Sequence, residues 1–264
     1  MAKVGICSLT GDNSVFVRSH ILPKALTKLS DNGERYLEKS LSSRSVWRSN
    51  SWYDYSLVTR KGEDILSEID TNGIKVLREN MLVWSGWKKR WSALPSEYFL
   101  QRTMQYNGGL LRFRRLDSLD TSAIRQFYLS ILWRAASSSR HEMKDIKIND
   151  EKLEIIKRII LDKTLDKNHI FPMDLDQIVT RGIHHNRTPI YENLAFKYND
   201  EEVTFGCFRI YFDGLVCRIY DSIEDDNVFS DLSEMLIQDN RVTLICRNFE
   251  HSRSCENLSD VINS

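Results

Sequence analysis

The sequence predicts an α+β fold with an N-terminal head, a helical region after it and a C-terminal antiparallel β-sheet. Three patterns support this prediction. Short strand-like runs near the N-terminus flank a Gly-Asp-Asn turn, apolar residues recur at helical spacing between residues 121 and 162, and β-rich runs dominate after residue 190. With 264 residues, 41% of them apolar, the chain can bury a sizeable core. We place the head at residues 1–90 and an α+β body at residues 91–264.

The head is expected to open with a β-hairpin. Its two strands are residues 4–9 and 14–18, and the turn Thr10–Asn13 is rich in residues that tolerate unusual backbone angles. Ser19 then precedes a short amphipathic helix whose first turn accepts Pro23. Three segments complete the head: an irregular stretch over 31–54, a strand over 55–59 and a helix over 62–79.

The body is expected to contain helices first and strands afterwards. Helices are predicted over 121–136 and 150–162, the second capped by Asn149, with a shorter helix around 175–183. Strands follow over 190–198, 203–212 and 215–220, and the dipeptide Asp213-Gly214 is a hairpin signal between the last two. A short helix near 228–237 and a final strand over 242–247 end the fold.

Composition excludes several classes of protein. Lys+Arg and Asp+Glu are both 37, which excludes a uniformly basic binder of nucleic acid, but residues 1–62 carry ten Lys/Arg against five Asp/Glu. This basic head suits an anionic ligand, unless the asymmetry reflects only solvated surfaces. No apolar run is long enough to span a membrane, and the first residues lack the apolar run of a signal peptide, so we expect a cytoplasmic protein. The five cysteines are scattered without a C-x-x-C pair, which predicts reduced thiols.

The head also carries a combination suited to phosphodiester hydrolysis. A histidine, His20, follows the hairpin and precedes a short helix. Hydrolysis of a phosphodiester requires a base for water and a divalent cation for the developing charge, and a neutral imidazole has a suitable pKa for the base. The alternative is that His20 is a helix cap or a core residue.

The segments Cys7-Ser8-Leu9-Thr10 and Ser19-His20-Ile21-Leu22-Pro23-Lys24 resemble the signature of a known family. They are similar to the SHIIPK-type branch of the HNH, or His-Me finger, endonucleases, which have a ββα-metal fold. The resemblance implies that His20 is the general base. Aligning residues 57–63 with the second C-x-x-C element of that branch places Asp54 on the position of its middle Asn and Glu63 on its metal-ligand position.

The chain departs from this family at its zinc-binding cysteines. Thr10, Thr59 and Gly62 stand at three of the four positions, and only Cys7 remains, so we expect no structural zinc. We expect packing by Trp47, Trp52 and the aromatic residues of 82–91 to replace it. Ser19 occupies the place before the base, where the family often has Asp or His, and it is a weak magnesium ligand.

The resemblance implies a metal-dependent endonuclease that acts on nucleic acid, with DNA expected ahead of RNA. His20 and Asp54 are its expected catalytic residues, and Glu63, with Asp54 or Asp64, is expected to hold Mg²⁺ or Mn²⁺. Six basic residues are candidates for phosphate contacts: Arg18, Lys24, Arg44, Arg48, Arg60 and Lys61. The resemblance further implies an effector of a bacterial antiphage or toxin system, with a regulatory protein partner or self-association.

The sequence leaves alternatives open for these assignments. The acidic residues at the start of helix 62–79 also suit the helix dipole, Asp54 also suits a turn, and the basic residues also suit a solvated surface. A second hypothesis is therefore a head that has lost catalysis and serves as a nucleic-acid-binding or protein-interaction module.

Overall fold

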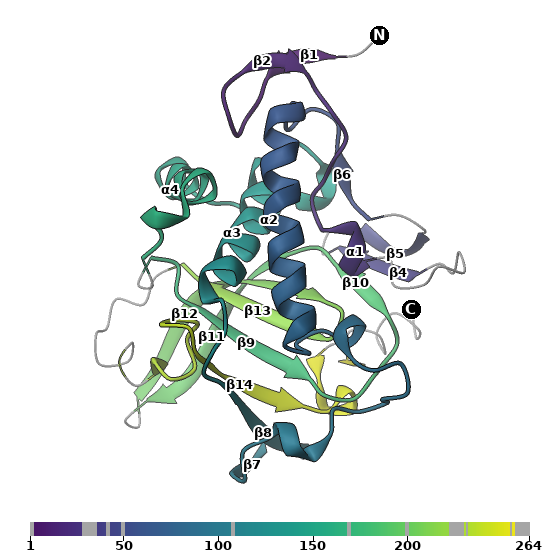
Figure 1. Cartoon of the computed structure of the whole chain (residues 1–264), viewed down its shortest axis with the longest axis vertical. Helices are drawn as coiled ribbons and strands as arrows, with labels where there is room; N and C mark the ends of the chain where they lie inside the picture. Colours follow the sequence, from purple (N-terminus) through teal and green to yellow (C-terminus); the bar gives the residue numbers. More distant parts are fainter. Residues whose placement is uncertain are drawn as a thin grey trace. The chain divides into compact units, whose positions relative to one another are not determined.

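The structure is a computed structural model that describes residues 3–27, 36–40, 43–48, 51–106, 109–167, 170–198, 201–221, 230, 232–253 and 255–256. It is a mixed α+β fold whose largest sheet has seven strands (Figure 1). The chain forms two compact units. The first unit comprises Met1–Val76, Ser122–Lys167 and His185–Tyr191, and the second comprises Leu77–Thr121, Asn168–His184 and Glu192–Ser264. Each unit is assembled from three segments that alternate along the sequence. The predicted boundary after residue 90 stays a prediction.

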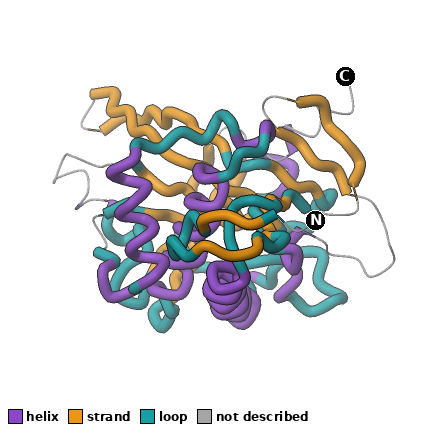
Figure 2. Tube along the Cα trace, turned by 90° about the horizontal axis from the view of Figure 1, so that it is seen from above, coloured by secondary structure: helices purple, strands orange, loops and turns teal. Residues whose placement is uncertain are grey.

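The first unit begins with the predicted hairpin. Strands β1 (Val4–Ile6) and β2 (Asn13–Val15) pair antiparallel, and Gly11 has a φ of 75° in the connecting turn. This confirms the hairpin, which lies beside the N-terminus in Figure 2. A second ribbon joins β3 (Ser19–His20) to β6 (Tyr53–Asp54), also antiparallel. The strand expected over 55–59 is therefore wrong in position, because β6 ends at Asp54.

A three-stranded sheet corrects the prediction for residues 31–54. Within the part of this segment that is described, β4 (Tyr36–Ser40) and β5 (Ser43–Arg48) pair antiparallel, and β10 (His185–Arg187) runs parallel to β4. The expectation of an irregular stretch is wrong. The polar composition of this segment hides the strands, and one strand of the sheet comes from a distant part of the sequence.

The α-helices described in the first unit are α1 (Lys24–Thr27), most of α2 (Arg60–Glu79), nearly all of α3 (Thr121–Ser137) and α4 (Asp150–Leu161). The predicted cap of α4 is confirmed, since Asn149 Oδ1 accepts a hydrogen bond of 2.8 Å from the Lys152 amide. Gly73 of α2 lies against Phe127 of α3, where an added Cβ would be 2.5 Å from the Phe127 side chain. The glycine in the middle of α2 therefore permits close packing of the two helices.

The second unit is built on a sheet of order β11-β12-β13-β9-β14-β8-β7. Its strands are β7 (Thr103–Tyr106), β8 (Gly109–Leu116), β9 (Met173–Ile178), β11 (Ile190–Tyr198), β12 (Glu201–Phe212), β13 (Leu215–Tyr220) and β14 (Val242–Arg247). The turn between β12 and β13 has Asp213 and Gly214 at positive φ, as the hairpin signal predicted. The sheet is mixed, however, because β14 and β9 are parallel, so the expectation of a purely antiparallel sheet is wrong.

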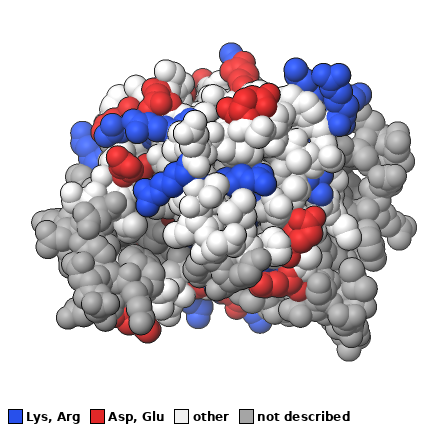
Figure 3. Space-filling model, turned by 90° about the horizontal axis from the view of Figure 1, so that it is seen from below, with Lys and Arg blue, Asp and Glu red and all other residues white. Residues whose placement is uncertain are grey.

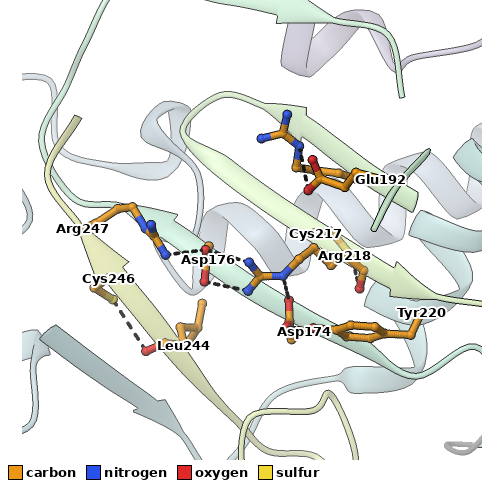
Figure 4. Close-up of polar contacts among 10 residues, drawn as sticks. Asp174, Asp176, Glu192, Cys217, Arg218, Tyr220, Leu244, Cys246 and Arg247 are labelled. Carbon is orange, nitrogen blue, oxygen red and sulfur yellow. Dashed lines mark hydrogen bonds and ion pairs between the residues drawn. The ribbon is translucent and has the colours of Figure 1, made fainter. Parts of the chain in front are cut away.

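Strand β9 replaces the helix expected around 175–183. All six of its residues are buried, including Asp174 and Asp176. Arg218 donates hydrogen bonds of 2.8 Å to Asp174 and 3.0 Å to Asp176, and Arg247 donates one of 2.9 Å to Asp176 (Figure 4). The ion pairs make buried carboxylates tolerable on this strand, and their arginines lie on β13 and β14, beyond the reach of local sequence patterns.

Short 3₁₀ helices within the described residues are Trp84–Gly86, Ser96–Tyr98, His141–Met143, Lys163–Leu165 and Phe249–His251. The helix expected near 228–237 lies in part outside the described residues. Of the described part, Ser230 and Leu232 are helical, as expected, whereas 233–235 form turns and Leu236 forms a bridge with Asp174. Trp84 and Trp87 are core residues of the second unit.

Candidate active site

The ribbon of β3 and β6 carries the residues that the sequence analysis singled out. Ser19 lies opposite Asp54 and His20 lies opposite Tyr53 in the antiparallel register. Asp54 is buried and both of its oxygens accept hydrogen bonds: Oδ1 from the Ser56 amide (2.7 Å) and hydroxyl (3.0 Å), and Oδ2 from the Ser138 hydroxyl (2.7 Å). Burial raises the pKa of Asp54, but the hydrogen bonds from Ser138 and Ser56 outweigh it and lower the pKa overall. Asp54 is therefore an ionised anchor of the ribbon.

His20 is half-buried, and its Nε2 is inaccessible to solvent and has no hydrogen-bond partner among the described residues. Burial lowers the pKa of His20, and the positive charges of Arg18, Lys24 and Arg134 lower it further. The imidazole is consequently neutral at neutral pH, which is the form that can accept a proton.

Glu63 occupies the first turn of α2 and is also half-buried. Its Oε2 is inaccessible and without a hydrogen-bond partner in the described structure. Burial raises the pKa of Glu63, while the nearby Ser19 hydroxyl and the Arg134 charge oppose this increase. Ser19 Oγ is buried too, and although it lies close enough to affect Glu63, it meets the geometry of no hydrogen bond among the described residues. Ser19, His20 and Glu63 thus each have a buried polar atom without a hydrogen-bond partner among the described residues.

The end of α3 holds the ribbon in place. Arg134 forms a buried, bidentate ion pair with Asp70 of α2, at 2.6 and 2.9 Å, and donates a hydrogen bond of 2.9 Å to the His20 carbonyl. Arg140, just after α3, donates a hydrogen bond of 3.1 Å to the Tyr53 carbonyl. Both strands are therefore fixed by residues that the sequence analysis assigned to the body and did not single out. An arginine inside the apolar face of helix 121–136 was the available signal for Arg134.

The predicted phosphate-binding residues lie on different elements of the first unit. Arg18 and Lys24 are exposed near the ribbon, and Arg60 and Lys61 are exposed at the start of α2. Arg60 lies 3.8 Å from Asp64, and both side chains are mostly in solvent, so Asp64 does not share the buried setting of Glu63. The side chains of Arg44 and Arg48 on β5 lie outside the described residues. On the face drawn in Figure 3, basic and acidic side chains are interspersed rather than separated.

The four positions that the resemblance assigns to zinc ligands lie together in space. The Thr10 amide donates to Cys7 Sγ at 3.5 Å, an added Cβ on Gly62 would lie 2.8 Å from the same sulfur, and Thr59 lowers the pKa of Cys7 through hydrogen bonds. The Thr59 hydroxyl also donates to Asp12 at 2.9 Å, and the Thr10 hydroxyl donates to Asp12 as well. Hydrogen bonds to Asp12 thus connect this cluster, and the expected replacement of zinc by tryptophan packing stays a prediction.

The tryptophans expected near this cluster are distributed over both units. Trp52 is buried within the first unit, Trp84 and Trp87 belong to the second unit, and the side chain of Trp47 lies outside the described residues. No group of three or more His, Cys, Asp and Glu residues that could hold a metal ion occurs in the described part of the chain.

No protein-family model, curated protein or solved structure matches the chain. Among the described helices, none combines the length and the apolar character needed to cross a membrane.

Proposed function

We propose that the protein is a metal-dependent endonuclease whose active site is formed by β3, β6 and the start of α2. In this proposal, the two strands and the helix correspond to the ββα-metal unit of the HNH family. The supporting observation is the set of unpartnered buried atoms: Ser19 Oγ, His20 Nε2 and Glu63 Oε2. A buried polar atom without a partner costs about 1–3 kcal/mol. Six further such atoms occur elsewhere among the described residues, so the support comes from finding three of them on residues that the alignment selects.

The cluster around Cys7 supports the alignment behind this proposal. The alignment assigns Cys7, Thr10, Thr59 and Gly62 to one metal site in related proteins, although the two pairs are about fifty residues apart in the sequence. Thr10, Thr59 and Gly62 all lie beside Cys7 in the structure. The same alignment places Glu63 on the metal-ligand position, so its correspondence with the family has support that is independent of the candidate active site.

The residues at the ribbon fit a magnesium-class cation that retains waters. Glu63 would supply a carboxylate oxygen and Ser19 a hydroxyl oxygen, both of which are hard ligands. Such an ion would stabilise negative charge on the phosphate and the leaving oxygen. Burial raises the pKa of Glu63, and a cation would favour its ionised form. The hydrogen bonds that occupy both oxygens of Asp54 give that residue a positioning role.

His20 would act as the general base. Its neutral imidazole accepts a proton from water, the water oxygen forms a bond to phosphorus, and the ester oxygen of one nucleotide leaves with the bonding electron pair. The Arg134 hydrogen bond to the His20 carbonyl holds the backbone from which the imidazole projects. Basic residues near the ribbon, Arg18 and Lys24, would attract the phosphates of the substrate.

The experiment that tests this proposal compares cleavage of plasmid DNA and of RNA with Mg²⁺ or Mn²⁺ for the wild type, His20→Ala and His141→Ala. His141 is an exposed histidine of the same unit, and its replacement is a matched control. We expect His20→Ala to reduce cleavage by at least about 100-fold, the usual contribution of a general base, and His141→Ala to leave it unchanged. Cleavage that persists in His20→Ala refutes the mechanism.

A second candidate function is a nucleic-acid-binding module without catalysis. Ser19 favours this candidate, because a hydroxyl is a weaker metal ligand than a carboxylate or an imidazole. The hydrogen bonds that occupy both Asp54 oxygens also favour it, because they leave this carboxylate less available to a metal ion. Binding of nucleic acid without metal-dependent cleavage by the wild type would support it. Control by a partner protein, or a place in a bacterial defence or toxin system, is proposed from the family resemblance alone.

A further inference from the structure

An aromatic and basic cluster lies on the same ribbon as His20. It consists of Arg18, Tyr53 and Tyr55, which we term the stacking cluster. The Arg18 guanidinium carbon lies 4.0 Å from the centroid of the Tyr53 ring, and the rings of Tyr53 and Tyr55 meet edge to face with centroids 5.1 Å apart. The Tyr53 ring thus contacts both the Arg18 guanidinium and the Tyr55 ring.

Tyr55 is a solvent-exposed aromatic residue. Its side chain is 57% exposed, and Tyr191, at 43%, is the other exposed tyrosine among the described residues. Arg18 is exposed as well, and no ion pair to it occurs within the described residues. By contrast, the neighbouring Arg140 is neutralised by Glu142 at 2.6 Å. The cluster therefore presents an uncompensated cation together with an aromatic surface that can accept another ring.

The stacking cluster is next to the proposed catalytic base. Tyr53 is the register partner of His20, and residues directly opposite in an antiparallel pair project from the same face. Their ring centroids are 6.2 Å apart in an edge-to-face arrangement. A phosphate at His20 would consequently have its neighbouring nucleotide within reach of Tyr55.

We propose that the stacking cluster binds an unpaired nucleobase beside the scissile phosphate, so that the substrate is single-stranded or locally unpaired nucleic acid. This inference rests on the proposed function, because it takes His20 as the site of cleavage. An aromatic ring recognises the face of a base, and a paired base within a duplex has both faces covered by its neighbours. Every base has such a face, so Tyr55 selects strand state rather than base sequence, while Arg18 adds attraction for the backbone.

The test measures binding separately from cleavage. Full-length protein is titrated, in EDTA, against a labelled single-stranded DNA, the matching single-stranded RNA and the DNA duplex of the same sequence. We expect tighter binding of both single strands than of the duplex. Tyr55→Ala is expected to weaken single-strand binding about 5- to 150-fold, which corresponds to the loss of about 1–3 kcal/mol of stacking on one base. Tyr55→Phe should bind like the wild type.

A 2-aminopurine base in the single strand reports stacking directly. We expect its fluorescence to be quenched by the wild type and by Tyr55→Phe, and not by Tyr55→Ala. Tyr191→Ala is the matched control for an exposed tyrosine and should change neither affinity nor quenching. Equal affinity for single strands and duplex, or unchanged binding and quenching in Tyr55→Ala, overturns the stacking cluster as a base-binding site.

The two proposals fail in different ways. Metal-dependent cleavage abolished by His20→Ala, but unaffected by Tyr55→Ala, retains the nuclease and removes the stacking cluster. Tyr55-dependent binding of single strands, without cleavage in Mg²⁺ or Mn²⁺, retains the binding site and removes the hydrolytic function.

Discussion

Arg134 connects the stability of the first unit to the geometry of the proposed base, and the two effects can be separated by mutation. Its guanidinium is bidentate to Asp70 and also donates to the His20 carbonyl at 2.9 Å. In Arg134→Met, the Asp70 carboxylate keeps its charge without its partner. In Arg134→Met/Asp70→Leu, the charge is removed as well, while the His20 carbonyl still lacks its donor.

The structure sets the expected magnitudes. The Arg134 side chain is 2% exposed and that of Asp70 is 17% exposed, so breaking the pair should cost about 3–5 kcal/mol. At about 2–4 °C per kcal/mol for a chain of this size, Arg134→Met should unfold roughly 6–20 °C below the wild type. The double variant should recover most of this loss, because a buried ion pair replaced by apolar residues is often neutral in stability. Its cleavage should nevertheless remain about 100-fold reduced, the effect of misplacing a catalytic group by about 1 Å.

The assay combines thermal unfolding with single-turnover cleavage, and α3 itself supplies the control. Arg125, on the same helix and also 2% exposed, makes a bidentate pair with Asp166 at 2.7 and 2.8 Å, and the Asp166 side chain is 9% exposed. Arg125→Met/Asp166→Leu should match the other double variant in stability and cleave like the wild type. Wild-type cleavage by Arg134→Met/Asp70→Leu would refute the positioning role, and an unchanged melting temperature of Arg134→Met would refute the argument from burial.

Two further predictions concern the proposed metal ligand and the alignment. Burial raises the pKa of Glu63 in the folded chain, so ionisation of Glu63 lowers the free energy of unfolding as the pH rises from the ordinary pKa of 4.5 through the folded pKa. Glu63→Gln should therefore be more stable than the wild type at pH 7, by about 0.5–2 kcal/mol in urea unfolding without metal. The difference should be smaller at pH 4. Equal differences at both pH values would contradict the burial of an ionisable group at this position. The triple variant Thr10→Cys/Thr59→Cys/Gly62→Cys, together with Cys7, should bind one zinc ion per chain and gain stability from it, because the four positions lie together. The control is the same triple variant with Cys7→Ala, which keeps only three of the four thiols. If the four-thiol variant does not bind zinc more tightly than this control, the alignment is contradicted.

Local signals predicted the elements that depend on neighbouring residues. The turn at Gly11, the cap at Asn149 and the hairpin at Asp213 are set by residues a few positions apart, and the structure has all three. The elements missed from the sequence depend on distant partners. Strand β4 is paired with β10, about 150 residues away, and the buried aspartates of β9 are neutralised from β13 and β14.

The candidate site divides in the same way. A motif of consecutive residues made His20 a candidate, and a fixed spacing within the aligned segment made Glu63 a candidate. Arg134 and the stacking cluster have no such motif, because their relation to His20 arises from the packing of α3 and from the register of β3 with β6. Asp64, one residue after Glu63, illustrates the limit of spacing alone: a rotation of about 100° along a helix separates a buried carboxylate from an exposed one.

The contrast between satisfied and unsatisfied atoms on one short ribbon is the main physical argument for a ligand at this site. Asp54 Oδ2 and the carbonyls of His20 and Tyr53 accept hydrogen bonds from residues on or just after α3, and Asp54 Oδ1 accepts two from Ser56. Packing around the ribbon is thus close enough to satisfy buried polar groups, and the open atoms of Ser19, His20 and Glu63 do not result from a loose environment. They occur together, on the residues whose chemistry suits a cation and a proton acceptor.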